Sequence, residues 1–150
     1  MQLSPDAPLS DHLAVLFRQL SRAVARHRGE LGHADYTVLS LLHRTGPRRV
    51  CDIADVDGPD TSTVSRRVAA LTDRELLVRT ADPDDARAHP VALTDRGRTV
   101  LHAERRRRAD LVDGALADWP ERDRVELARL LARLNASLGE RATTHERTSA

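Results

Sequence analysis

The segment Pro59–Leu77, PDTSTVSRRVAALTDRELL, constrains the fold of this chain more than any other stretch. Its second residue, Asp60, is a good helix N-cap, because an aspartate carboxylate can accept hydrogen bonds from the free backbone N–H groups of a first turn. We therefore predict a helix from Thr61 to about Arg74. Three apolar residues would share one narrow side of this helix, since they are spaced by four and three: Val64, Val68 and Leu71.

The opposite side of the predicted helix carries hydroxyl groups, small side chains and an arginine. Its residues are Ser62, Thr63, Ser65, Arg66, Ala69 and Ala70. A face with donors and without bulky apolar groups suits the major groove of DNA, where hydroxyl and guanidinium groups contact base edges and phosphates. An ordinary amphipathic surface helix with solvated arginines explains the same pattern. The helix by itself leaves both interpretations open.

Two short strands are predicted directly after this helix, at Leu76–Arg79 and Val91–Leu93. Both alternate β-branched or leucine residues, and a polar loop containing Pro83 joins them. Two further helices are predicted before it, at about 35–44 and 50–56. Helices followed by a hairpin in this order are typical of a winged helix-turn-helix. The predicted fold class is therefore mainly α, with a small β-hairpin wing.

The hairpin region carries a more specific pattern. The wing signature of the MarR family of bacterial transcriptional regulators, D-x-x-D-x-R-x-x-x-V-x-L-T-x-x-G, is similar to the residues that stand here: Asp82, Asp85, Arg87, Val91, Leu93, Thr94 and Gly97. The segment TSTVSRRVAALTDRELLVR also resembles that family's recognition helix and first wing strand. The resemblance covers about Leu9–Leu138. One departure is Glu75, where the family usually has the glycine that a helix C-terminus favours for a left-handed turn.

Apolar residues at spacings of three and four predict a long helix near each end of the chain, over about 9–28 and about 118–140. The C-terminal helix carries more leucine than one side of a small domain would cover, which indicates a second subunit. In the MarR family the two terminal helices build a dimer, so the resemblance implies a homodimer. The rest of this single domain would be a winged helix-turn-helix lobe over about 35–98 and a connecting helix over about 95–117.

The DNA-binding interpretation specifies a set of contact residues. Arg66 and a cluster of hydroxyl groups would read bases or bind phosphates, while Arg67 and Arg79 would contact the DNA backbone. By resemblance, Arg87 at the wing tip would enter a minor groove, with Asp85 orienting its side chain. The hydroxyl cluster comprises Thr61, Ser62, Thr63 and Ser65. Two copies of the helix in a dimer would enter successive major grooves of a near-palindromic operator on double-stranded DNA.

The MarR resemblance also implies a small-molecule effector that releases a repressor from DNA, often a phenolic or other aromatic acid. Its pocket would lie where the helical dimer region meets the DNA-binding lobe. From helix position, we expect four residues near such a pocket: His12, Phe17, Tyr36 and His43. Ordinary core or surface packing is the stronger explanation for each of these residues.

Motifs for catalysis and cofactors are missing from the sequence. It has no nucleophile elbow, phosphate-binding glycine loop or dinucleotide fingerprint, and its seven histidines lack zinc-ligand spacing. We therefore expect no enzyme activity, no cofactor and no metal site. The sequence has no apolar run of about 18 residues and no export signal, which predicts a cytoplasmic protein without a membrane span.

Two features favour alternative functions. The formal net charge is +1, and residues 35–98 carry ten arginines against eleven aspartates and glutamates. A winged-helix protein-interaction module with weak DNA affinity fits this neutral lobe, because nothing in its bulk charge attracts nucleic acid. A redox-sensing regulator could use the single Cys51, although we expect a buried structural thiol there. The arginine run 105–108 would circle its helix, so we expect it to be solvated.

Overall fold

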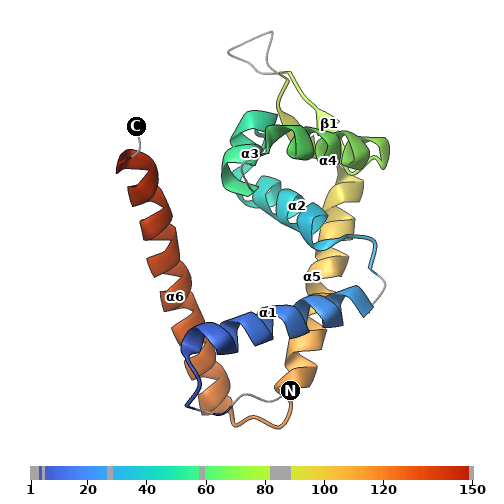
Figure 1. The fold of residues 1–150 in the computed structure, drawn as a ribbon. Coiled ribbons are helices and arrows are strands. Elements are labelled where there is room, and N and C mark those ends of the chain that lie inside the picture. The colour runs from blue at the N-terminus through green and yellow to red at the C-terminus, as the bar shows by residue number, and fades with distance from the viewer. Residues whose placement is uncertain (1–3, 5, 27–28, 58–59, 82–88, 149–150) are drawn as a thin grey trace. The chain divides into compact units, whose positions relative to one another are not determined.

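The structure is a computed structural model that describes residues 4, 6–26, 29–57, 60–81 and 89–148, and of residues 57 and 140–148 only the backbone. Two compact units make up the chain, residues 1–111 and residues 112–150. The described residues form helices and a two-stranded antiparallel sheet (Figure 1). In chain order these are α1 (Leu9–Arg26), α2 (His33–Thr45), α3 (Val50–Asp57), α4 (Thr61–Asp73), β1 (Leu77–Arg79), β2 (Val91–Leu93), α5 (Asp95–Ala115) and α6 (Glu121–Thr148). The predicted fold class, mainly helical with a hairpin wing, is confirmed.

The core of the first unit lies where α2, α3, α4, the two strands and α5 meet. The apolar stripe predicted for α4 is fully buried in it, and the inward residues of α2 and α3 complete it. Each such side chain stabilises the fold by roughly 1.5–3 kcal/mol. Its most buried members are Leu39, Ile53, Leu71, Leu76, Leu77, Leu101, Val38, Val68 and Val91. This core gives α4 a rigid support and leaves its other face in solvent.

The C-terminal end of α4 closes as a Schellman motif. The Leu76 N–H donates to the Leu71 carbonyl oxygen at 3.0 Å, and the Glu75 N–H donates to the Thr72 carbonyl oxygen at 2.8 Å. Glu75 has a φ of 60°, the left-handed conformation that glycine adopts without strain. The backbone therefore makes the left-handed turn that favours glycine, with a glutamate at that position.

The wing makes one backbone pairing that the sequence does not predict. β1 and β2 pair antiparallel, with Leu77 opposite Leu93. The segment before α3 adds an isolated bridge, in which Arg48 N–H donates to Val91 O at 3.1 Å and Val91 N–H donates to Arg48 O at 2.8 Å. No periodicity marks a single bridging residue, so this pairing cannot be read from the local pattern. The bridge ties the start of α3 to the wing.

Helix α1 has no buried residue over its whole length, although it is strongly amphipathic. Leu9 is 69% exposed and Phe17 is 64% exposed. In the second unit, α6 likewise exposes Val125 and Leu138. Monomers rarely expose such apolar stripes, so both helices have a face that suits a partner.

The last helix differs from its predicted bounds. It begins at Glu121 rather than at 118 and runs to Thr148, beyond the predicted end at 140. The polar residues after Leu138 carry no apolar repeat, which is why the pattern predicted a shorter helix. In the described part of the chain, no helix is long and apolar enough to cross a lipid bilayer.

Candidate nucleic-acid interface and cavity

The N-terminal end of α4 is held by the predicted cap. One carboxylate oxygen of Asp60 accepts a hydrogen bond from the Ser62 N–H at 3.0 Å, and the other accepts from the Thr63 hydroxyl at 2.6 Å. The hydrogen bond from Thr63, followed by those from Ser62, lowers the pKa of Asp60 to about 2. Because the Thr63 hydroxyl donates its hydrogen bond to Asp60, its oxygen is left to act as an acceptor toward an outside partner.

Arg66 lies on the exposed face of α4 and folds back toward the helix N-terminus. Its Nη2 donates to the Ser62 Oγ at 3.1 Å, and its Nε donates to the Ser62 carbonyl oxygen at 3.3 Å. These bonds hold the guanidinium beside the hydroxyl groups. The structure thus brings five predicted contact residues together on one exposed surface: Thr61, Ser62, Thr63, Ser65 and Arg66. Their contact with DNA stays a prediction.

The next arginine of α4 is placed differently. The side chain of Arg67 is 24% exposed, and its Nε lies 3.8 Å from a carboxylate oxygen of Asp35 on α2. Arg74, the C-cap residue of α4, donates through Nη1 to the other oxygen of Asp35 at 3.0 Å. One carboxylate of α2 therefore faces two arginines of α4. The predicted contact of Arg67 with a DNA phosphate would have to be made from the edge of the helix.

The remaining predicted contacts belong to the wing. Arg79 ends β1 and is exposed, opposite Val91 in the hairpin register. Asp85 and Arg87 lie outside the described residues. Their predicted roles at a minor groove therefore stay predictions.

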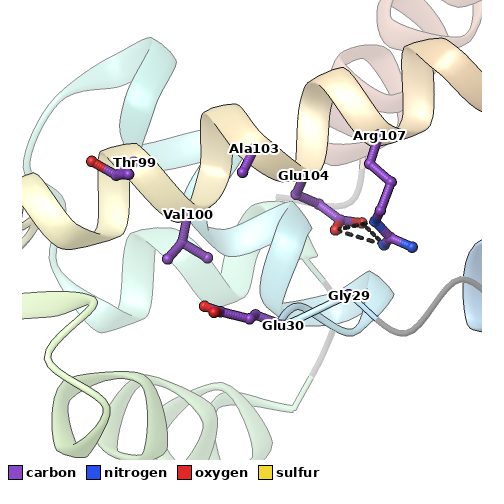
Figure 2. Close-up of a pocket in the computed structure, with 7 residues that line it drawn as sticks. All are labelled: Gly29, Glu30, Thr99, Val100, Ala103, Glu104 and Arg107. Atoms are coloured by element: carbon purple, nitrogen blue, oxygen red, sulfur yellow. Dashed lines mark hydrogen bonds and ion pairs between the residues drawn. The ribbon is translucent and has the colours of Figure 1, made fainter.

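A cavity of about 330 Å³ opens between the segment that precedes α2 and one face of α5 (Figure 2). A Cβ added to Gly29 would overlap the Arg107 guanidinium, so this glycine lets the backbone approach α5 closely. The sequence does not single out this site, because small and polar residues spaced by three and four on a helix also occur on ordinary solvent-facing surfaces. The cavity is lined by Gly29, Glu30, Thr99, Val100, Ala103, Glu104 and Arg107.

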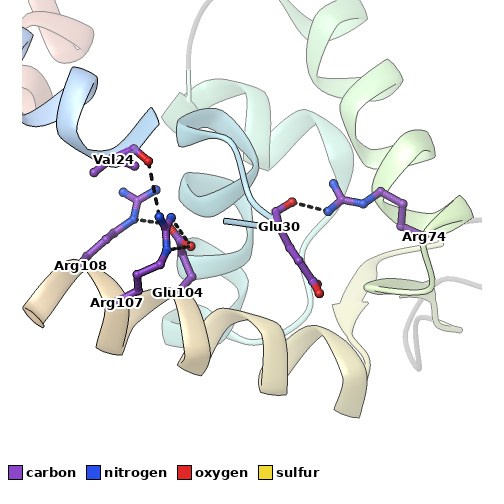
Figure 3. A network of polar contacts seen from close by, with 6 residues as sticks. All are labelled: Val24, Glu30, Arg74, Glu104, Arg107 and Arg108. Atoms are coloured by element: carbon purple, nitrogen blue, oxygen red, sulfur yellow. Dashed lines mark hydrogen bonds and ion pairs between the residues drawn. The ribbon is translucent and has the colours of Figure 1, made fainter. Parts of the chain in front are cut away.

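A charged cluster forms one wall of this cavity. Glu104 is 4% exposed, and its carboxylate accepts hydrogen bonds from Arg107 Nη2 at 2.6 Å and from Arg108 Nε at 2.7 Å (Figure 3). Burial raises the pKa of Glu104, but the hydrogen bonds from both arginines outweigh it and leave the pKa below its ordinary value. Arg107 also donates to the Val24 carbonyl oxygen of α1 at 3.5 Å, and the Arg108 guanidinium lies 3.7 Å from the centroid of the Tyr36 ring.

The prediction that the whole arginine run is solvated is therefore wrong for Arg107 and Arg108. Both are partly buried, because the carboxylate of Glu104 one turn earlier points inward and is stabilised by their positive charges. An acid three and four residues before two arginines is a signal that the sequence does contain.

None of the four predicted ligand residues lines the cavity. Tyr36 lies beneath Arg108, and His12 is partly buried on α1. The rings of Phe17 and His33 meet edge to face with centroids 6.2 Å apart, and those of His43 and His102 with centroids 5.3 Å apart. Desolvation lowers the pKa of His43, and the nearby positive charges of Arg105, His102 and Arg98 lower it further.

Cys51 is exposed on α3, so the expectation of a buried thiol is wrong. The inward face of this short helix is formed by Ile53 and Ala54 instead. The Cys51 thiol lies 3.5 Å from a carboxylate oxygen of Asp52. Among the described residues, no group of three or more histidine, cysteine, aspartate or glutamate side chains could hold a metal ion.

Known proteins are similar to this chain in sequence and in the arrangement of their elements. The profile of the MarR family matches residues 31–89. The HTH-type transcriptional regulator YxaD of Bacillus subtilis (strain 168) is 33% identical over 110 residues, which cover 73% of this chain and 77% of YxaD.

Solved structures extend the likeness over most of the chain. A crystal structure of MarR has a TM-score of 0.80 and 21% identity, over 93% of this chain and 97% of that one. The Bordetella bronchiseptica regulator BpsR, whose DNA binding is regulated by 6-hydroxynicotinic acid, has a TM-score of 0.61 and 25% identity, over 83% of this chain and 98% of that one.

Proposed function

The chain belongs to the MarR family of winged helix-turn-helix transcriptional regulators, and we propose that it acts as a homodimeric repressor that a small molecule releases from double-stranded DNA. The observation that carries this proposal is the exposed face of α4. There Arg66 is hydrogen-bonded beside a cluster of hydroxyl groups on a helix whose other side is buried. A rigid helix with this face suits the major groove.

The local geometry of α4 compensates for the neutral charge of its lobe. The Asp60 cap orders the first turn, and the bonds to Ser62 hold the guanidinium of Arg66 in place before any DNA arrives. Preorganised groups lose little conformational freedom on binding, which favours affinity from few contacts. Arg66 and the hydroxyl cluster would contact bases and phosphates, and Arg67, Arg79 and the wing residues would contact the DNA backbone and the minor groove.

The apolar faces of α1 and α6 support the homodimer. Both helices expose leucine, valine or phenylalanine side chains that a second subunit would cover. A two-fold dimer presents two recognition helices about 34 Å apart, one turn of B-DNA, and reads a near-palindromic operator.

The cavity beside Gly29 is the proposed effector site. Its surface combines apolar area with the charged cluster that forms one wall, and small-molecule sites usually pair apolar surface with a few polar groups in this way. BpsR responds to an aromatic acid, and a similar acid here would have to compete with Glu104 for Arg107, because Glu104 already holds that guanidinium. An effector would act by favouring a conformation of the dimer in which the winged helix-turn-helix lobes of the two subunits no longer fit the operator.

The test of DNA binding is a fluorescence anisotropy titration of the purified protein on its own upstream intergenic DNA, at two salt concentrations. We expect specific, salt-sensitive binding and a loss of about tenfold or more with Arg66→Ala. Arg106→Ala, which removes an exposed arginine of α5 outside this face, is the matched control. If Arg66→Ala binds as tightly as the parent, the assignment of the α4 face is wrong.

A protein-interaction module is the second candidate, supported by the near-neutral lobe. Such a module would bind operator and random DNA equally weakly and with little dependence on salt, because few phosphate contacts would release counterions. The same titration therefore separates the two functions.

A further inference from the structure

Arg74 ties the recognition helix α4 to two other segments of the first unit. Its Nη1 donates to the Asp35 carboxylate on α2 at 3.0 Å. Its Nη2 donates to the backbone carbonyl oxygen of Glu30 at 2.6 Å (Figure 3). Charge-assisted hydrogen bonds of this length are among the stronger ones in proteins. Since Arg74 is the C-cap residue of α4, both bonds act directly on the end of the recognition helix.

Glu30 is at the same time a wall residue of the cavity. Figure 2 shows its side chain at the cavity while Figure 3 shows its carbonyl oxygen meeting Arg74. The segment of Gly29 and Glu30 thus has the cavity on one side and the recognition helix on the other. A displacement of this backbone would change the distance between the Glu30 carbonyl oxygen and Arg74.

The α5 wall of the cavity lies close to the segment of Gly29 and Glu30, so a filled cavity would push this segment away from α5. A Cβ on Gly29 would overlap the Arg107 guanidinium, so the backbone already touches the charged cluster of α5. Arg107 is held there by Glu104 and by the Val24 carbonyl oxygen. Of the two walls, the buried cluster on α5 is the more firmly held, and a bulky occupant would move Gly29 and Glu30.

We propose that Arg74 is the positioning residue through which occupancy of the cavity reaches the recognition helix. An occupant displaces the Glu30 carbonyl oxygen, Arg74 follows or loses that bond, and the end of α4 shifts against α2. The proposal rests on the proposed function, because altered DNA binding is its consequence. Coupling between two sites requires one structural element whose state depends on both of them. The hydrogen bond between Arg74 and the Glu30 carbonyl oxygen is that element for the cavity and α4.

A covalent occupant tests this proposal without knowledge of the natural effector. Cys51→Ser removes the single native thiol, and Ala103→Cys places one thiol in the cavity wall. Benzyl methanethiosulfonate attaches a benzylthio group to this thiol through a disulfide and releases methanesulfinate. We expect labelling to weaken DNA affinity by about tenfold. Ala109→Cys, on the exposed part of the same helix and outside the cavity, should show no such loss when labelled.

Two variants separate coupling from ordinary stabilisation. Arg74→Gln and Asp35→Asn both remove the ion pair between Arg74 and Asp35. Asp35→Asn also removes the pair with Arg67, but it leaves the bond from Arg74 to the Glu30 carbonyl oxygen. In the Ala103→Cys background, labelling should still weaken DNA binding in Asp35→Asn and should change it less than twofold in Arg74→Gln. An equal loss in both variants would overturn the proposal.

Hydrogen exchange of the backbone amides in residues 70–77 gives a readout that needs no DNA. Labelling at Ala103→Cys should speed exchange there in the parent and leave it unchanged in Arg74→Gln. If the labelled parent exchanges as slowly as the unlabelled one, Arg74 does not couple the two sites. If exchange responds but specific DNA binding is absent, the coupling stands and the proposed function fails.

Discussion

The hydroxyl of Thr94 donates a hydrogen bond to the carbonyl oxygen of Glu75 at 2.7 Å. The same hydroxyl oxygen accepts from the Gly97 N–H at 2.9 Å, which makes Thr94 the N-cap of α5. One hydroxyl therefore joins the end of α4 to the start of α5 across the base of the wing. This joint gives a physical reason for the threonine and the glycine of the wing signature.

The left-handed backbone of Glu75 predicts a stabilising substitution. Glycine adopts this φ without the steric cost that a Cβ brings, so Glu75→Gly should raise the free energy of unfolding by about 1 kcal/mol. Urea denaturation monitored by circular dichroism measures it. Glu75→Ala, which keeps the Cβ and removes the rest of the side chain with the carboxylate that faces Arg96, should bring no gain. Equal stabilisation by alanine would show that the charge, and not the backbone, is responsible.

A substitution at Gly97 should lower the free energy of unfolding rather than raise it. A Cβ there would overlap the Leu76 carbonyl oxygen, a backbone atom that the wing holds in place, so Gly97→Ala should lower the free energy of unfolding by about 2 kcal/mol. Gly114→Ala is the matched control on the same helix, because a Cβ at Gly114 meets nothing within 4 Å. It should stabilise by about 0.5–1 kcal/mol, the difference in helix propensity. Similar losses in both variants, measured by urea denaturation, would exclude the overlap as the cause.

The buried carboxylate of Glu104 predicts a large loss on neutralisation. Glu104→Gln would remove the negative charge to which the partly buried Arg107 and Arg108 both donate, which should cost about 2–3 kcal/mol of unfolding free energy. Glu126→Gln breaks the exposed pair with Arg129 and should leave the stability nearly unchanged. Thermal unfolding of the two variants side by side checks the difference. Equal melting temperatures would contradict the structural role of the cluster.

The cap of α4 predicts an acid-dependent term in stability. The pKa of Asp60 is about 2 in the folded chain, below the ordinary value of 3.8. Because the folded pKa is depressed, this contribution is fully present above pH 3.8 and is lost as the pH falls toward about 2. The difference in unfolding free energy between the parent and Asp60→Asn, whose amide cannot titrate, should shrink over that window. A difference independent of pH would show that Asp60 does not titrate with a depressed pKa.

The exposed apolar face of α1 predicts a change in oligomeric state. Leu16→Glu places a charge on that face and should shift the protein from dimer toward monomer, because burying an unpaired carboxylate at an interface is costly. Light scattering after size-exclusion chromatography measures the mass. Gln19→Glu adds the same charge beside the stripe and should leave the dimer intact. A monomeric parent would contradict the homodimer itself.

Several elements could be predicted because the reason for each lies within a few residues of sequence. The Asp60 cap, the buried stripe of α4 and the strand Val91–Leu93 follow from side-chain chemistry and spacing, and the structure confirms all three. The exposed hydroxyl groups beside Arg66 follow from the same helical periodicity. Helix α6 shows the limit, since its last turns continue past the apolar repeat that predicted it.

The class of this protein, the order of its elements and the face that α4 presents all follow from local sequence patterns. The bridge between Arg48 and Val91, the exposure of Cys51 and the bond from Arg74 to the Glu30 carbonyl oxygen depend instead on how distant segments pack. The physical reason is the range of the interactions. A cap or an apolar stripe depends on neighbours along the chain, whereas the position of a backbone carbonyl or the exposure of a thiol depends on segments that only packing brings together.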